Sequence, residues 1–119
     1  MTKLGNINLF VRDVAKSLQF YTEVLELSQS VERSELPHFA LLEAGSCTIT
    51  LQDAATPGFV SGDSVSVELG FEVMDIASVR QRFEKWSLDV SQVQQMGWGS
   101  GFDAYDLDGH RLTIYRMRE

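Results

Sequence analysis

The sequence predicts an α+β fold made of two tandem βαβββ modules, and an internal repeat is the main reason. The stretch Asn6–Tyr21 reads as a strand running into a helix, and Glu68–Phe83 repeats it at an offset of 68 − 6 = 62 residues. A repeat of this length usually marks a supersecondary unit that must pack against its copy. Each copy has one helical pattern among its strands, which favours mixed strand pairing over a doubly wound sheet.

The repeat carries like residues at matched positions. The matched pairs are Val11 and Val73, Asp13 and Asp75, Val14 and Ile76, Ala15 and Ala77, Tyr21 and Phe83. We expect a single domain, residues 1–119, made of modules at about 1–58 and 62–119.

The first module opens with an alternating strand, Ile7–Val11, whose aliphatic residues should meet the helix. Asp13 stands where a helix N-cap belongs, and apolar residues recur at helical spacing over Val14–Leu25. Strands are expected at Phe39–Glu43 and Ser46–Gln52.

The connections of this module are less regular. Ala44 and Gly45 predict a hairpin turn, and Pro37 limits the preceding segment, residues 28–36, to an edge strand or a loop. Residues 53–64 have the composition of a linker between the modules.

The second module repeats the plan, with a strand at Val65–Val73, an N-cap at Asp75 and a helix that follows. A short strand is expected at Val90–Val93. Gly97 and Gly99 flank Trp98, whose large indole we expect to be buried.

The C-terminal part of this module predicts a hairpin. Strands at Phe102–Tyr105 and Arg111–Tyr115 are joined by a turn over Asp106–Gly109.

Composition excludes several classes of function. The net charge of −7 disfavours binding to nucleic acid and to anionic membranes, although it also serves solubility. There is no long apolar run and no signal-peptide pattern at the N-terminus, so we expect a cytoplasmic protein. Cys47 is the only cysteine, which rules out an internal disulfide.

Four stretches together resemble the vicinal-oxygen-chelate superfamily, which includes glyoxalase I, extradiol dioxygenases, and the fosfomycin- and bleomycin-resistance proteins. These stretches are Asn6–Asp13, Ser17–Leu27, Gly97–Gly99 and Asp106–Leu112. The resemblance implies paired βαβββ modules whose curved mixed sheets enclose a cavity, usually in a homodimer. It also implies a divalent ion held by inward-facing side chains, normally His or Glu, from the first and last strands of each module.

Carried over to this chain, the implied metal positions mostly lack metal ligands. They fall on Asn6, Thr50, Glu68 and Thr113. A catalytic divalent site needs about three anionic or imidazole donors, and neutral amide and hydroxyl oxygens bind transition ions weakly. His38 and His110 are not expected to replace them, because His110 should be solvated after its turn. We therefore expect no metal and no other cofactor.

Strand alternation extends these positions to a predicted ligand-binding face. Its candidate residues are Asn6, Asn8, Phe10, Thr50, Gln52, Glu68, Glu72, Trp98, Arg111, Thr113 and Tyr115, with Thr48 and Gly70 on the same face. Cys47 falls on the opposite face and is expected to be a small buried side chain rather than a nucleophile.

Two functions remain open at this point, beside a third in which the chain is an interaction module with a vestigial cavity. The first is a metal-free binding protein of the bleomycin-resistance type that sequesters a planar, neutral-to-cationic small molecule. The second is a divergent enzyme of the superfamily, lyase or dioxygenase-like, with Glu68 as a general base or as its only strong metal ligand. Arg111 on the same face could neutralise a glutamate, which would weaken the preference for a cation.

Overall fold

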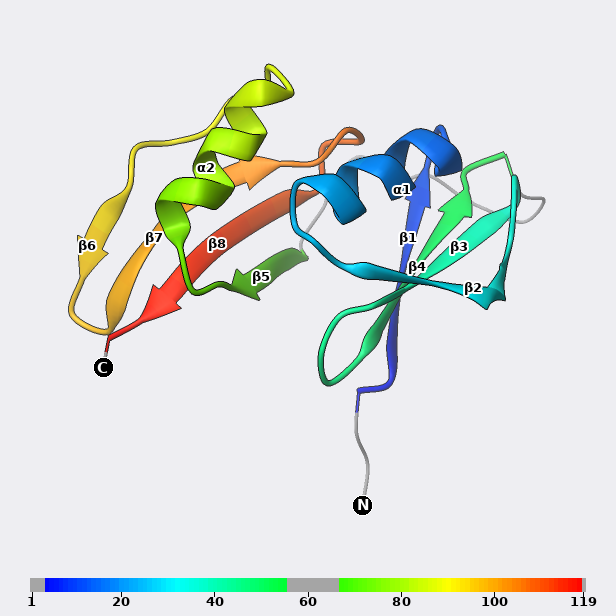
Figure 1. Ribbon diagram of the computed structural model, residues 1–119, viewed down its shortest axis with the longest axis horizontal. Helices are drawn as coiled ribbons and strands as arrows, with labels where there is room; N and C mark the ends of the chain where they lie inside the picture. The colour runs from blue at the N-terminus through cyan, green and yellow to red at the C-terminus, as the bar shows by residue number, and fades with distance from the viewer. Residues whose placement is uncertain (1–3, 56–66, 119) are drawn as a thin grey trace. The chain divides into compact units, whose positions relative to one another are not determined.

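The computed structural model describes residues 4–55 and 67–118, which form helices and strands in two compact units, Met1–Ser61 and Gly62–Glu119 (Figure 1). Each unit has the element order βαβββ. The predicted α+β class with two tandem βαβββ modules is therefore confirmed. Most of the predicted linker, residues 53–64, lies outside the described residues, as does the start of the strand expected at Val65–Val73.

The first unit has one helix and a four-stranded mixed sheet. Its elements are β1 (Asn6–Val11), α1 (Val14–Glu23), β2 (Ser28–Glu35), β3 (Phe39–Glu43) and β4 (Thr48–Asp53). The strand order is β1-β4-β3-β2, in which β1 runs parallel to β4 and the other pairs are antiparallel. The segment before Pro37 is an edge strand, as its proline predicts.

Helix α1 begins where the sequence places its cap. The Asp13 carboxylate accepts a hydrogen bond from the Lys16 amide at 3.0 Å, which satisfies one of the free N–H groups of the first turn. Phe20 and Tyr21 of α1 are fully buried, as are Val11 of β1 and Leu51 of β4. The aliphatic face of the strands therefore packs against the helix.

The second unit repeats this arrangement. Its elements are β5 (Glu68–Glu72), α2 (Ile76–Lys85), β6 (Gln94–Met96), β7 (Gly99–Tyr105) and β8 (Arg111–Met117). The strand order is β5-β8-β7-β6, with β5 parallel to β8. Figure 1 shows α2 lying over one face of this sheet. The Phe83 ring of α2 meets the Phe102 ring of β7 edge to face, with 5.7 Å between centroids.

The short strand expected at Val90–Val93 is wrong, because β6 begins one residue later, at Gln94. Val90 forms only an isolated bridge with Ala104. At Ser91 the ladder is interrupted: its hydroxyl accepts from the Asp103 amide at 2.8 Å, and its carbonyl accepts from Arg80 Nε of α2 at 3.1 Å. Side chains therefore form hydrogen bonds with the Ser91 carbonyl and the Asp103 amide, which backbone groups would pair in a regular strand ladder.

Two further expectations need correction. Cys47 is only half-buried, because it closes the β3–β4 turn, where its carbonyl accepts from the Ala44 amide at 3.0 Å. Trp98 is 45% exposed, since it occupies the turn between β6 and β7 at the end of the sheet. Among the described residues no helix is long and apolar enough to span a membrane.

Candidate ligand-binding faces

The first unit carries a polar sheet face on the side away from the buried aliphatic residues. In β1 and β4 the buried residues, such as Leu9 and Ile49, alternate with residues that are half-buried or exposed. We call the second set the first polar face: Asn6, Asn8, Phe10, Thr48, Thr50 and Gln52. The parallel register places Asn6 opposite Thr48 and Asn8 opposite Thr50, so the predicted residues of this unit share one face.

Hydrogen bonds between side chains link most of the first polar face. Asn6 Oδ1 accepts from the Thr48 hydroxyl at 2.7 Å and from the Thr50 hydroxyl at 3.1 Å. Asn8 Nδ2 donates to Gln52 Oε1 at 2.8 Å. The groups in this network are neutral amides and hydroxyls.

The corresponding face of the second unit can be described in rows, because register partners in a sheet point to the same side. We call it the second polar face, and it has three rows: Glu68, Arg111 and Tyr105; Gly70, Thr113 and Asp103; Glu72, Tyr115 and Gly101. Leu112 and Ile114, which alternate with these residues on β8, are fully buried. The predicted site residues of β5 and β8 therefore lie together.

The first two rows form a charged network. Glu68 accepts a hydrogen bond from the Thr113 hydroxyl through one oxygen, and its other oxygen lies 3.4 Å from Arg111 Nε. Arg111 Nη2 donates to Asp103 Oδ2 at 3.2 Å, and the Thr113 hydroxyl lies 3.3 Å from Asp103 Oδ1. Arg111 is therefore held between two carboxylates.

Asp103 is a member of this site that the sequence analysis missed. It lies in β7, which was expected only as a C-terminal hairpin strand with no partner assigned to its residues. Asp103 and Thr113 are register partners across the β7–β8 hairpin. Counting outward from the turn at Asp106–Gly109 with antiparallel pairing could have found it.

The third row has an aromatic character. The rings of Tyr115 and Trp98 meet edge to face, with centroids 5.7 Å apart and planes at 80°. The Tyr115 ring leans over Gly70, where an added Cβ would lie 3.4 Å from the ring. At Gly101 an added Cβ would lie 2.8 Å from the Ile114 carbonyl oxygen, so a side chain there would collide with the backbone of β8.

His110 lies away from both faces, and it is not solvated as predicted. Its side chain is 19% exposed, and Nδ1 lies 2.7 Å from Oδ2 of the nearly buried Asp106. Asp106 Oδ1 also accepts from the amides of Asp108 and His110, both at 2.9 Å. The hydrogen bond to Asp106 raises the pKa of His110 above its ordinary 6.5, although burial opposes the shift. The pair belongs to the turn before β8 and lies outside the four implied metal positions.

The residues at the four implied metal positions do not fit a divalent ion. In each unit the first-strand position is hydrogen-bonded to the last-strand position, Asn6 to Thr50 and Glu68 to Thr113. Three of the four offer only neutral oxygens, which bind transition ions weakly. Across the described parts of the chain, 4–55 and 67–118, no group of three or more His, Cys, Asp or Glu side chains is arranged to hold a metal ion.

The sequence profile of the Glyoxalase/Bleomycin resistance protein/Dioxygenase superfamily matches residues 3–114. The chain belongs to this superfamily. The match covers both units and confirms the resemblance read from the sequence. No curated protein sequence matches the chain significantly.

Solved structures of this superfamily share the fold at low sequence identity. One is a glyoxalase/bleomycin resistance protein/dioxygenase family enzyme from Burkholderia phytofirmans PsJN (TM-score 0.86, 15% identity, 98% of this chain and 100% of that one). Another is TnmS3, an antibiotic binding protein from Streptomyces sp. CB03234 (0.76, 17%, 99% and 98%). A third is lactoylglutathione lyase from Agrobacterium tumefaciens (0.71, 17%, 98% and 94%). At these identities the likeness establishes the fold alone.

Proposed function

We propose that this superfamily member is a metal-free binding protein that sequesters a planar, neutral-to-cationic small molecule through polar residues of its sheets. The observation that carries the proposal is the direct hydrogen bonding between the implied metal positions, Asn6 with Thr50 and Glu68 with Thr113. Side chains that would have to converge on an ion are bonded to each other instead. What remains is a polar surface with hydrogen-bonding groups and aromatic rings.

The charge of the second polar face supports the preference for a cation. Glu68, Glu72 and Asp103 carry negative charge there, and Arg111 carries the one positive charge among the face residues defined above. Exposed carboxylates favour cationic or hydrogen-bond-donating ligands, and ionic strength weakens that preference. Tyr115 and Trp98 supply flat surfaces for a ring system.

The similar antibiotic binding protein TnmS3 supports the class of function, since a protein of this fold binds a small molecule. The similar lactoylglutathione lyase is the reason that an enzyme remains the alternative function. An enzyme with Glu68 as general base needs that carboxylate desolvated and free to accept a proton. Here its side chain is 45% exposed, and both of its oxygens are engaged by Thr113 and Arg111.

The family resemblance also underlies a proposed homodimer in the cytoplasm. This part of the proposal has its own test. Sedimentation at tens of micromolar protein should give the mass of two chains, and a monomer would remove the dimer without affecting the proposed binding.

The first experiment measures metal content and ligand binding on the same preparation. Protein purified without chelator should contain no stoichiometric zinc, nickel, manganese or iron by elemental analysis. Bound metal that is lost in the Glu68→Ala variant would overturn the proposal and favour the enzyme.

Ligand binding is followed through tryptophan fluorescence, because the chain has two tryptophans and one lies on the candidate site. In the Trp86→Phe variant Trp98 is the sole reporter, whereas Trp98→Phe is the matched control that leaves Trp86. A planar amine should quench the first variant with micromolar affinity, about −8 kcal/mol, and leave the second nearly unchanged. If no planar compound, cationic or neutral, changes the fluorescence or the melting temperature at millimolar concentration, the protein does not have the proposed function.

A further inference from the structure

The three carboxylates of the second polar face are not equivalent. Glu68 and Asp103 both contact Arg111, at 3.4 and 3.2 Å, and both lie within hydrogen-bonding range of the Thr113 hydroxyl. Two carboxylates and one guanidinium leave this network with a charge of about −1, and each carboxylate already pairs with Arg111 and Thr113. A cation that approached Glu68 would also meet the positive charge of Arg111.

Glu72 is in a different situation at the other end of β5. Within residues 4–55 and 67–118 its side chain has no hydrogen-bond or ion-pair partner, and it is exposed. Its register partner on β8 is Tyr115, so the two residues lie side by side on the same face, and the Tyr115 ring leans over Gly70 of the same strand as Glu72. The Val73 amide donates to the Tyr115 carbonyl at 2.9 Å, which continues the pairing past Glu72.

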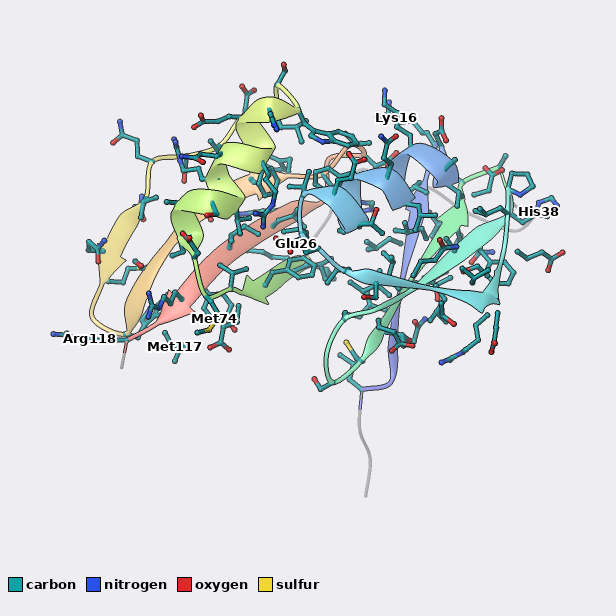
Figure 2. All side chains as sticks on the ribbon, in the orientation of Figure 1. Lys16, Glu26, His38, Met74, Met117 and Arg118 are labelled. Carbon is teal, nitrogen blue, oxygen red and sulfur yellow. The ribbon has the colours of Figure 1, made fainter. Side chains whose placement is uncertain are left out.

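The surroundings of Tyr115 favour a cation that carries carbon substituents. Trp98 meets the Tyr115 ring at 80°, so two aromatic rings lie at nearly a right angle, and Tyr115 is the register partner of Glu72. The next row outward contains Met117 and Met96 on either side of Gly99, and Met117 is 49% exposed. Figure 2 shows Met117 and Met74 at the end of the unit where β8 finishes. Thioether side chains adapt to irregular apolar groups such as N-methyl groups.

From this arrangement we infer that Glu72, Tyr115 and Trp98 form a recognition corner for an alkylated organic ammonium group. The inference rests on the proposed function and names the chemical class of the ligand. Aromatic faces attract a cation through their quadrupole, and a weakly hydrated alkylammonium loses less solvation on binding than a primary amine. Glu72 supplies the counter-charge, whereas Glu68 and Asp103 act as positioning residues that hold Arg111 away from the corner.

The test compares two probes of the same shape that differ in charge. The cation is 3-hydroxyphenyltrimethylammonium, and 3-tert-butylphenol is its neutral counterpart with carbon in place of nitrogen. Calorimetric titration of the full chain should give an affinity about tenfold higher for the cation at low salt. Raising the salt concentration should lower the ratio of the cation's affinity to that of the neutral probe, because salt screens the exposed charge of Glu72.

Two charge-removing variants then locate the effect. Glu72→Gln should reduce the ratio of the two affinities to near one, while leaving the affinity for the neutral probe almost unchanged. Glu84→Gln removes the same charge from α2, where Glu84 pairs with Arg80 at 2.5 Å, and should leave the ratio as in the wild type. Equal melting temperatures for Glu72→Gln and the wild type would show that the fold is unaffected.

The outcomes separate this inference from the proposed function. If both probes bind the wild type equally well, or if Glu72→Gln and Glu84→Gln change the ratio to the same extent, the ammonium corner is wrong and small-molecule binding stands. Tighter binding of 3-hydroxybenzoate than of the cation would also overturn the corner and make Arg111 the determinant. If neither probe binds, the ammonium corner is wrong, and the fluorescence screen of planar compounds alone decides the proposed function.

Discussion

The two polar faces rest on the same backbone plan and differ in chemistry. In both units the first strand pairs in parallel with the last, and Asn6 faces Thr48 as Glu68 faces Arg111. The first face is a network of neutral amides and hydroxyls. The second is an ion-paired network with an aromatic end. On the face that packs against the helix, close packing restricts each strand to apolar side chains that fit. The polar face is not restricted by that packing, so its residues can differ between the two units.

The largest expected effect tests whether the two cores are as alike as the backbone plan suggests. Leu51 and Ile114 occupy matched places on β4 and β8, and both are fully buried. Leu51→Ala and Ile114→Ala should each lower the free energy of unfolding by about 2–5 kcal/mol, through lost burial and the cavity left behind. Urea denaturation measures both changes.

The matched control for this pair is Val31→Ala on β2, whose side chain is 74% exposed. It should change the free energy of unfolding by less than about 0.5 kcal/mol. A loss below about 1 kcal/mol at Leu51 or at Ile114 would contradict the assignment of that residue to a close-packed core.

A smaller effect tests the charge difference between the faces. Arg111→Gln removes the cation that Glu68 and Asp103 share, so the second polar face becomes more negative. The affinity for 3-hydroxyphenyltrimethylammonium should rise a few-fold, and stability should fall by less than about 1 kcal/mol because the pairs are half exposed. Arg33→Gln in the first unit, where Arg33 lies 3.9 Å from Glu43, should leave the affinity unchanged. Weaker binding in Arg111→Gln would mean that the arginine itself contacts the ligand.

The smallest effect concerns the hairpin turns that close the two sheets. The second unit has the Asp106–His110 pair at its turn, and the first has Ala44–Cys47 there. Because the pKa of His110 is raised in the folded state, its contribution to stability is present below pH 6.5 and is lost as the pH rises through the folded pKa.

The free energy of unfolding measured between pH 5.5 and 8.5 should therefore show a decrease above pH 6.5 that His110→Gln removes. The control is His38→Gln in the first unit, which should keep that decrease. The same pH profile in the wild type and in His110→Gln would show that the ion pair does not stabilise the turn.

Local chemistry was enough to predict much of the fold. Both N-caps, Asp13 and Asp75, accept from the amides three residues later, as their position before an apolar helical pattern implies. Strand alternation correctly placed Leu9 and Val11 on the buried face of β1, with Asn6 and Asn8 on the other face. These features depend on backbone periodicity and on neighbours a few residues away, which the sequence states directly.

Register and end effects were decided only in the tertiary structure. Asp103 joins the site because β7 pairs with β8 in a register that brings it opposite Thr113, and alternation within one strand does not specify that register. Trp98 stays exposed and His110 is covered because each lies at a turn, where long-range packing sets the burial of a side chain and alternation no longer applies. Periodicity thus determined which residues of one strand share a face, whereas strand pairing determined which residues of different strands lie together.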